Sequence, residues 1–483
     1  MGKDSKYILS LIFIVFLTRI FLLEGENTYQ SIDPINYIFG SISFDLKGGS
    51  PHLPGSILYC KLIYLVNYLI NDYHKSLITI NLFWTLASIP FSYFILKHYK
   101  VNYHFISVLF IYSIPGIWFY TSITEYYAFD LFFSVIILYL VTNNKYLFLT
   151  PIILAIGMGY RQSSGVLLAP IIFYNIVIYI RTKGITRNLI LSSILSMIVL
   201  SSWLYSLIES TGGLSEYIDL YTNKNPIPES TTLKNLVKMS SFGLFFFITT
   251  LFLFRAKFLG KFRIELILSI LPGLIFFALM HYNKGYFMLI TVPIIVQSLI
   301  LFKPKLTRLY VAILLNLIIY FLSPSIFPVY YNKMKSDKRP VSKLQLQSER
   351  MMFGFSSNYG TIVKGDQLFD ELEKLEIPNN SKIAFDQSLP IQVKLFSYNK
   401  GLDSTYYFNS SSNLKLYQLI SLDYKMVDIS ILNSDFIFIG HSEFFKNYLF
   451  DIASSLNQSQ NFTVYKINED YLYKYQSILE DNF

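Results

Sequence analysis

The residues best suited to chemistry gather in one stretch near the start of the chain, between Tyr29 and Tyr59. Asp33 stands there before Pro34, and proline biases the residue that precedes it toward extended backbone. A carboxylate in a polar loop can act as a general base or help to coordinate a divalent cation. Asp is also a favoured N-cap of helices, so a purely structural role for Asp33 stays open.

Two more polar groups follow Asp33 in the same stretch. His52 lies in the run Pro51-His52-Leu53-Pro54-Gly55, which predicts a rigid turn because proline restricts φ and glycine tolerates positive φ. Asp45, which follows Phe44, could pair with His52 or simply face water. On spacing alone, a solvent-facing histidine is the simpler interpretation of His52.

Charged residues also interrupt the apolar sequence further on. Glu125 and Asp130 flank the start of a long apolar run, where acidic residues are costly and often functional. Arg161 and Gln162 separate two further apolar runs. The fork of an arginine suits a phosphate or diphosphate, although anchoring at a membrane interface explains it equally well.

A later basic and aromatic cluster contains His281, Lys284 and Tyr286, and its aromatic residues alone would form an ordinary interfacial belt. The sequence has no metal-ligand spacing, P-loop, Rossmann glycine pattern or nucleophile elbow. Cys60 is the single cysteine, which excludes an intramolecular disulfide and a cysteine metal cluster. We therefore expect no cofactor beyond a divalent cation near Asp33.

The composition shows what must position these residues. Of 483 residues, 53% are hydrophobic and only 15% are charged, whereas soluble domains carry about 25% charged residues. Apolar runs with little or no charge recur from residue 7 to residue 324, each long enough for a helix across about 30 Å of hydrocarbon. The chain is predicted to be a multi-pass α-helical membrane protein. Much of the lysine and arginine behind its net charge of +9 then lies in short loops, where it sets the orientation of the chain in the membrane. No nucleic-acid partner is expected.

The distribution of lysine and arginine predicts the topology. If the stretch 56–71 lies along the outer surface, every basic cluster in a short loop falls on the cytoplasmic side. Lys61 near its middle favours this choice, because an interfacial helix lets lysine snorkel. The N-terminus is then cytoplasmic, and the polar clusters meet outside with the first outer loop, residues 24–76. The eleven expected spans are 7–23, 77–96, 104–120, 127–143, 146–159, 164–180, 188–207, 240–254, 264–280, 286–302 and 309–324.

The character of the chain changes after residue 324. Residues 325–349 are predicted to be a linker, and residues 350–483 a small extracytoplasmic α/β domain behind the transmembrane domain 1–324. Short alternating patterns favour strands at 382–385 and 435–440, and helices at 367–375 and 443–456.

These clusters together resemble the bacterial branch of the polyprenyl-phosphate-sugar-dependent membrane glycosyltransferases of the GT-C fold, near protein O-mannosyltransferases and lipid A aminoarabinose transferases. The resemblance covers about residues 7–324 and is most specific in the first outer loop. It rests on Asp33-x-x-Asn36-Tyr37-x-x-Gly40, Phe44-Asp45, Pro51-His52-Leu53-Pro54-Gly55-x-x-Leu58-Tyr59, Arg161-Gln162-Ser163, and His281 to Tyr286 with Pro293 beyond. Leu53 replaces the first proline of the pair usual in this group.

The resemblance implies an inverting transfer of one sugar from a polyprenyl-phosphate carrier to a lipid, glycan or protein acceptor, on the outer face of the cell membrane. Asp33 is then the general base, with Asp45 and Glu125 as further catalytic candidates. The implied substrate-binding residues are Asn36, Tyr37, His52, Arg161, Gln162, His281, Lys284 and Tyr286. Arg161 and Lys284 would hold the carrier phosphate, so a cation would replace a general acid.

Two other functions stay open on the sequence. A transporter or flippase of lipid-linked sugars also needs many spans, but it usually carries charges near the midplane and an inverted repeat. An O-antigen ligase or polymerase would carry its main catalytic loop late in the chain. The clustering of charge at one surface, with the signature in the first loop, favours the transferase.

Overall fold

The computed structural model describes residues 2–20, 32–47, 51, 53–143, 145–224, 247–253, 260–279 and 284–322, together with nine strands between residues 330 and 467. The chain forms two compact units. One comprises residues 1–25 and 53–361, and the other comprises residues 26–52 and 362–483. His52 and His281 lie outside the described residues.

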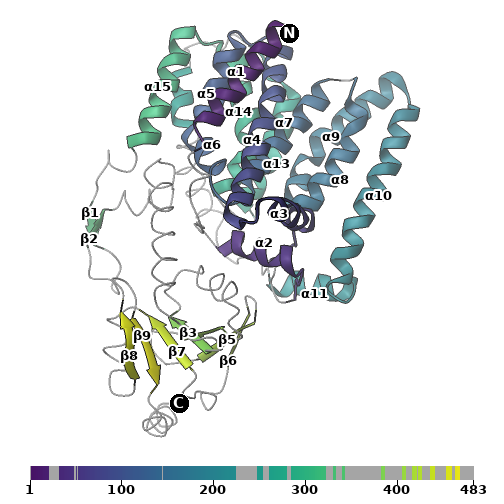
Figure 1. The fold of residues 1–483 in the computed structure, drawn as a ribbon. Helices are drawn as coiled ribbons and strands as arrows, with labels where there is room; N and C mark the ends of the chain where they lie inside the picture. Colours follow the sequence, from purple (N-terminus) through teal and green to yellow (C-terminus); the bar gives the residue numbers. More distant parts are fainter. Residues whose placement is uncertain are drawn as a thin grey trace. The chain divides into compact units, whose positions relative to one another are not determined.

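The first unit is a bundle of helices (Figure 1). Its long elements are α1 (Lys3–Leu17), α3 (Ile57–Ile70), α4 (Tyr73–His98), α5 (His104–Ser113), α6 (Pro115–Tyr120), α7 (Tyr127–Thr142), α8 (Thr150–Tyr160), α9 (Gln162–Lys183), α10 (Arg187–Glu209), α11 (Leu214–Lys224), α13 (Ile264–Leu279), α14 (Phe287–Phe302) and α15 (Leu306–Leu322). Among the described residues, the 3₁₀ turns that accompany them are η2 (Leu147–Leu149), η3 (Ile248–Leu253) and η4 (Lys284–Tyr286).

Most of these helices follow the apolar runs of the sequence, but α1 ends at Leu17 and the expected span 240–254 contains the 3₁₀ turn η3. Because lipid offers no hydrogen-bond partner to a backbone, an apolar run that crosses a membrane must close its own bonds in a helix. The run 127–143, for example, becomes α7 (Tyr127–Thr142). The expected span 104–120 is broken between α5 and α6, where Pro115 begins the second helix.

Within the described residues, α4, α9 and α10 are long and apolar enough to cross a membrane, and further apolar helices are shorter. Together they make the chain a multi-pass membrane protein. The count of eleven spans and the direction in which the chain crosses stay predictions.

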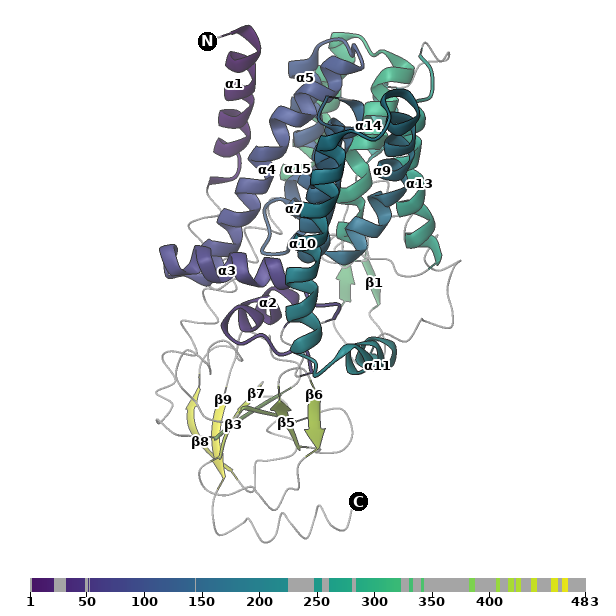
Figure 2. The same ribbon diagram turned by 90° about the vertical axis from the view of Figure 1, so that its right-hand side faces the viewer.

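Helix α3 differs from its neighbours in direction. Its axis lies nearly perpendicular to those of α4 and α10 (Figure 2). Tyr64, Leu65, Tyr68 and Leu69 form an exposed apolar face on α3. That the stretch 56–71 lies along the membrane surface stays a prediction.

The interior of the bundle is built around α7. This helix packs against α4 on one side and against α14 on another. Phe133 of α7, Ile89 of α4 and Ile295 of α14 are fully or almost fully buried. A helix that is apolar all round and buried all round suits the centre of such a bundle.

Part of the first outer loop is a helix, α2 (Ile32–Ile42), which belongs to the second unit. Asp33 lies in its first turn, so the expectation of extended backbone at Asp33 is wrong. Pro34 is compatible with this turn, because the first N–H groups of a helix have no intrahelical partner and proline has none to offer. The helix places Asp33, Asn36 and Tyr37 on one face, since residues three and four apart are neighbours.

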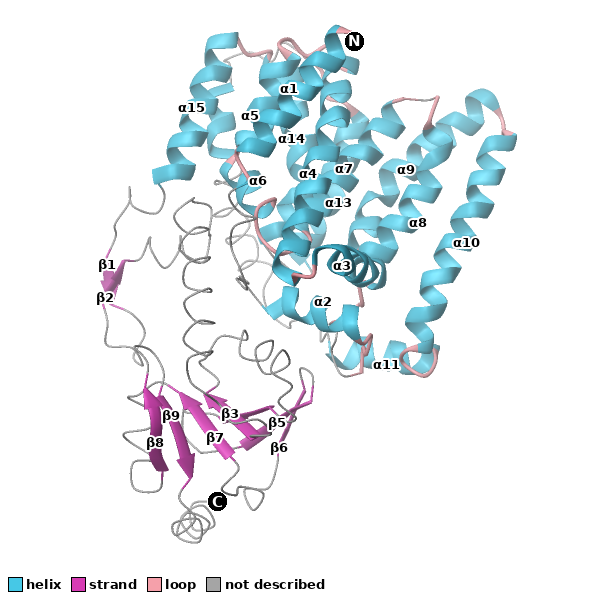
Figure 3. Ribbon diagram, in the orientation of Figure 1, coloured by secondary structure: helices cyan, strands magenta, loops and turns pink. Residues whose placement is uncertain are grey.

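The strands of the second unit form one mixed sheet (Figure 3). Its order is β6-β5-β4-β3-β7-β9-β8, with β3 parallel to β4 and β7 and the other pairs antiparallel. The strands are β3 (Lys382–Asp386), β4 (Thr405–Phe408), β5 (Leu416–Ile420), β6 (Asp423–Met426), β7 (Phe436–Gly440), β8 (Ala453–Gln458) and β9 (Thr463–Ile467). A short antiparallel pair, β1 (Tyr330–Asn332) and β2 (Pro340–Ser342), precedes them in the first unit.

The strand predictions at 382–385 and 435–440 are confirmed by β3 and β7, which are neighbours in the sheet. The helix expected at 443–456 is wrong at its end, because Ala453 begins β8. Pairing of β8 with β9 provides hydrogen-bond partners for the backbone there, and it overrides the local preference for a helix. The helix expected at 367–375 lies outside the described residues.

Candidate functional site

The site begins with the short loop Thr121–Tyr126, which joins α6 to α7 and is buried throughout. Two side chains from distant parts of the sequence hold it. Asn81 of α4 donates from Nδ2 to the backbone oxygens of Ile123, at 2.5 Å, and of Glu125, at 2.6 Å. These bonds place the loop that carries Glu125, whose side chain is itself buried.

Arg19, just beyond α1, holds the other end of this loop. Its Nε donates to Thr121 Oγ1 at 3.0 Å, and its Nη2 donates to the Tyr112 backbone oxygen at 3.2 Å. Its guanidinium also lies over the Trp118 ring at 5.4 Å. The side chain is 2% exposed, so these contacts replace the water that a buried cation has lost.

Arg161 is the second buried arginine and stands at the N-cap of α9. Its Nη1 forms an ion pair with Asp130 Oδ2 in the first turn of α7. Ser164 Oγ donates to the other oxygen, Asp130 Oδ1, at 2.5 Å. Both charged groups are buried, and a buried pair is tolerable when further hydrogen bonds satisfy it in this way.

Tyrosine rings surround the guanidinium of Arg161. Its Cζ lies 4.3 Å from the ring centroid of Tyr286, 4.8 Å from that of Tyr126 and 5.4 Å from that of Tyr127. Such contacts favour a cation over the ring face, the more so away from water. Gly285 allows this packing, because a Cβ at that position would overlap the Tyr127 ring.

The turn that carries Pro54 and Gly55 is tied to two later helices. Gln162 Nε2 donates to the Gly55 backbone oxygen at 2.8 Å, and Tyr217 Oη donates to the Pro54 backbone oxygen at 3.0 Å. Gly55 has φ of 85°, a conformation that favours glycine. Burial raises the pKa of Tyr217 to about 12, so its hydroxyl keeps the proton that it donates.

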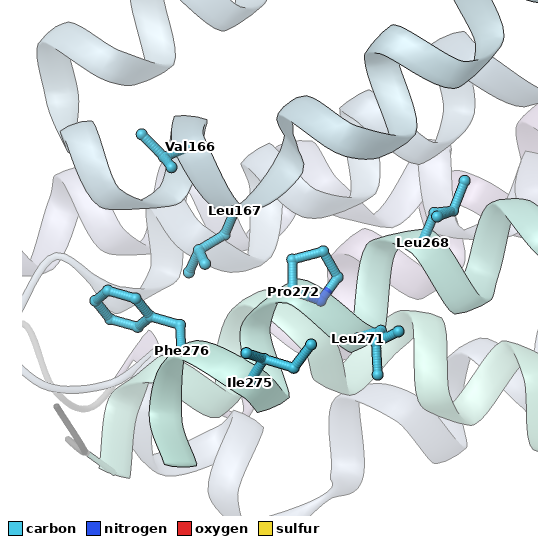
Figure 4. Close-up of a pocket in the computed structure, with 7 residues that line it drawn as sticks. All are labelled: Val166, Leu167, Leu268, Leu271, Pro272, Ile275 and Phe276. Carbon is cyan, nitrogen blue, oxygen red and sulfur yellow. The ribbon is translucent and has the colours of Figure 1, made fainter. Parts of the chain in front are cut away.

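An apolar groove opens between α9 and α13, with a volume of about 390 Å³ (Figure 4). Leu167 of α9 and Pro272 and Phe276 of α13 form its walls. Leu167 and Phe276 also border a second, much smaller pocket, whose polar lining includes Arg161, Ser163 and Tyr286. The apolar groove and the small pocket beside the arginine therefore share two lining residues.

The structure brings some of the sequence-predicted residues together. Arg161 and Tyr286 are in contact, and Glu125 lies in the loop next to Tyr126. Gln162, expected to bind substrate, instead holds the turn at Gly55 through its amide nitrogen. Lys284 lies in η4, and its side chain lies outside the described residues, as do His52 and His281.

The remaining predicted residues belong to α2 and the segment after it, in the second unit. Asp33 is half-buried, Tyr37 is buried and Asp45 is exposed. Asn36 is buried, and neither its amide nitrogen nor its amide oxygen has a hydrogen-bond partner in the described part of the chain. Nowhere among the described residues do three His, Cys, Asp or Glu side chains meet in a way that could hold a metal ion.

Sequence reasoning missed several residues that build the site. Asp130 and Arg161 were both notable as charges at the ends of apolar runs, but their pairing was not foreseen. Arg19 lies inside the first apolar run and Asn81 lies inside the second. Both could have been singled out in the sequence, because a polar group within a span needs a partner. Ser164 carried no signal in the sequence.

Comparisons with known proteins agree with this architecture. No family model matches the sequence, and no curated protein matches it. The fold, however, matches the crystal structure of ArnT from Cupriavidus metallidurans bound to undecaprenyl phosphate, with a TM-score of 0.60 and 7% identity over 95% of this chain and 97% of that one. The same protein in the apo state matches with a TM-score of 0.61 and 9% identity over 96% and 98%. The chain therefore has the GT-C fold of ArnT along nearly its whole length.

Proposed function

From this GT-C fold, we propose that the protein is a membrane glycosyltransferase of the cell envelope. It moves one sugar from a polyprenyl-phosphate donor to a lipid, glycan or protein acceptor, with inversion at the anomeric carbon. The bilayer supplies the donor, and the reaction takes place on the outer face of the membrane. The ArnT structure that contains undecaprenyl phosphate supports this class of donor.

The observation that carries the proposal is the groove between α9 and α13, which shares Leu167 and Phe276 with a small pocket that Arg161 lines. A polyprenyl phosphate has a long apolar chain and an anionic head. The groove offers apolar walls that include Val166, Leu271 and Ile275, all of them exposed at the surface of the bundle. The chain of the donor would bury this surface, while its phosphate would approach the arginine.

The small pocket beside Arg161 has a volume of about 10 Å³, room for about one water molecule. A phosphate is larger, so its binding requires a side chain at the border to move. Phe276 is the natural one, because it borders both the groove and the small pocket and is only half-buried. Rotation of this ring would join the two spaces.

The chemistry needs a base on one side of the sugar and a stabilised leaving group on the other. The acceptor oxygen forms a bond to the anomeric carbon as the bond from that carbon to the phosphate oxygen breaks. The proton of the acceptor hydroxyl passes to Asp33, and the carrier phosphate leaves with the electron pair. Arg161 offsets the charge that develops on the phosphate, which removes the need for a general acid.

Three features support Asp33 as the base. It is half-buried in the first turn of α2. Asn36 follows one turn later on the same face, with a buried amide suited to a sugar hydroxyl. The sequence motif around Asp33 resembles the first outer loop of the transferase group.

We place the active site outside because the basic residues of the short loops then face the cytoplasm. In this arrangement residues 350–483 form an extracytoplasmic domain after the linker 325–349, and the transferase domain 1–324 acts without it. Cysteine labelling at Lys100 and Arg187 of intact cells tests the orientation. Reaction of both positions with an impermeant reagent from outside would reverse it.

Asp33→Asn tests the mechanism. Asn keeps the size of Asp but cannot take a proton at neutral pH, so the single-turnover rate at saturating donor should fall about 10²–10⁴-fold. The assay uses purified full-length protein with a panel of polyprenyl-phosphate sugars. Asp45→Asn and Glu125→Gln are the comparison variants. A rate within a few-fold of wild type for Asp33→Asn, with loss in one of the others, would assign the base to that residue.

A further inference from the structure

The ion pair of Arg161 with Asp130 raises a question that phosphate binding alone does not answer. An arginine meant only to attract an anion would gain from standing without a carboxylate beside it. Instead Asp130 is fully buried against Arg161, and Ser164 fixes its second oxygen. The guanidinium beside the small pocket is therefore held in an ion pair with a buried carboxylate.

Charge matters more here than at a surface. Charges interact more strongly where protein excludes water, and Arg161 is 5% exposed and Asp130 is 0% exposed. Arg161 still reaches the small pocket that adjoins the groove. An anion entering that pocket is therefore attracted by the guanidinium and repelled by the carboxylate behind it.

The donor and the spent carrier of the proposed reaction differ in charge. A sugar linked to polyprenyl phosphate is a phosphodiester and carries one negative charge. The released polyprenyl phosphate is a monoester whose second pKa is about 6, so it carries nearly two charges at neutral pH. A lone buried arginine would hold the spent carrier more tightly than the donor and would slow its release.

We propose that Asp130 is a positioning and specificity-determining residue that offsets the charge of Arg161, so that the site holds the singly charged donor and releases the doubly charged spent carrier. Ser164 keeps the carboxylate in place for this role. This inference rests on the proposed function, because it requires the carrier phosphate to reach Arg161. It adds product release to the properties that the site controls.

The test measures binding of two probes to the purified full-length protein at pH 7.5. One probe is undecaprenyl phosphate, a monoester, and the other is its methyl phosphodiester. Wild type should bind the monoester no more tightly than the diester. Asp130→Asn keeps the shape and one hydrogen-bond acceptor for Ser164, and it should bind the monoester about tenfold more tightly while its affinity for the diester changes less.

Turnover gives a second readout that a merely structural role would not produce. In Asp130→Asn, kcat should fall while KM for the donor falls or stays constant, because release of the spent carrier becomes slow. Ser134→Ala is the matched control, since Ser134 lies one turn later on α7, is buried, and its hydroxyl has no partner in the described part of the chain. It should bind both probes as wild type does.

The outcomes separate this inference from the proposed function. If Arg161→Ala loses affinity for undecaprenyl phosphate but Asp130→Asn does not gain it, the role of Asp130 is refuted and the carrier site stands. If Arg161→Ala binds as wild type does, the carrier site itself is refuted. Should Asp130→Asn fail to fold, wild type alone decides, because tenfold tighter binding of the monoester than of the diester would overturn the inference.

Discussion

Arg19 and Arg161 are two buried arginines that serve the same stretch of chain in different ways. Arg19 donates to Thr121, at the start of the loop that joins α6 to α7, and to the Tyr112 backbone oxygen in α5. Arg161 pairs with Asp130 just after that loop and lines a small pocket that adjoins an apolar groove. Both have aromatic rings beside their guanidinium groups.

The comparison shows that burial of a cation does not by itself indicate function. Arg19 donates hydrogen bonds to a hydroxyl and to a backbone carbonyl near the loop. We therefore expect loss of Arg19 to lower the free energy of unfolding. Arg161 has a carboxylate partner and also lines a cavity. We therefore expect loss of Arg161 to weaken binding of the carrier phosphate and to lower turnover. The following variants separate these two roles.

The largest effect is expected at Arg161. Arg161→Met should lower turnover about 10²–10³-fold, because the leaving phosphate loses its cation. It should also destabilise the fold by about 3–5 kcal/mol, because Asp130 is left buried without its partner. Adding Asp130→Leu should restore most of the stability and none of the turnover. Thermal unfolding measures the stability, and single-turnover rates measure the catalysis. Recovered turnover in the double variant would contradict a catalytic role for Arg161.

Arg19→Met should show the opposite pattern. Loss of its hydrogen bonds should lower the free energy of unfolding by about 2–4 kcal/mol, the scale of bonds made by a charged donor. Turnover per folded molecule should stay within about tenfold of wild type, since the group does not touch substrate in the proposed mechanism. A stable Arg19→Met protein without activity would place Arg19 in the site and break the comparison.

Asn81 tests whether the loop depends on being held at its second end. Asn81→Ala should lower the free energy of unfolding by about 2 kcal/mol, because two buried carbonyl oxygens lose their donor. Asn81→Asp should be worse than Asn81→Ala, since it directs a carboxylate at the oxygens of Ile123 and Glu125. Thermal unfolding of the two variants beside wild type is the measurement, and an Asn81→Ala protein as stable as wild type would contradict the role of this donation.

The smallest effect is expected at Tyr286, the ring nearest to Arg161. Tyr286→Leu should weaken binding of undecaprenyl phosphate about fivefold, because a cation over a ring contributes about 1 kcal/mol. Tyr286→Phe keeps the ring and should bind within about twofold of wild type. Titration with the carrier measures both, and a large loss in Tyr286→Phe would show that the hydroxyl contributes more than the ring.

The sequence by itself determined the helices of the membrane unit. Apolar runs that enter lipid have one local solution, so the run 127–143 becomes α7 and the run 286–302 becomes α14 (Phe287–Phe302). It also predicted that 56–71 lies along the membrane surface, because Lys61 in its middle disfavours a crossing, and this stays a prediction. The candidate residues Arg161 and Tyr286 came from the sequence as separate clusters, and their contact did not.

The tertiary structure alone decided which polar groups meet. Asp130 and Arg161 are 31 residues apart, Arg19 and Thr121 are 102 apart, and Gln162 reaches Gly55 across 107. Hydrophobic periodicity reports the environment of one segment and contains no information about which distant segment faces it. The helical conformation of Asp33 escaped prediction for a related reason, since the local bias of a residue before proline is weak enough for its surroundings to override. The partners of a buried charge are set by how the helices pack, and packing is a property of the whole chain.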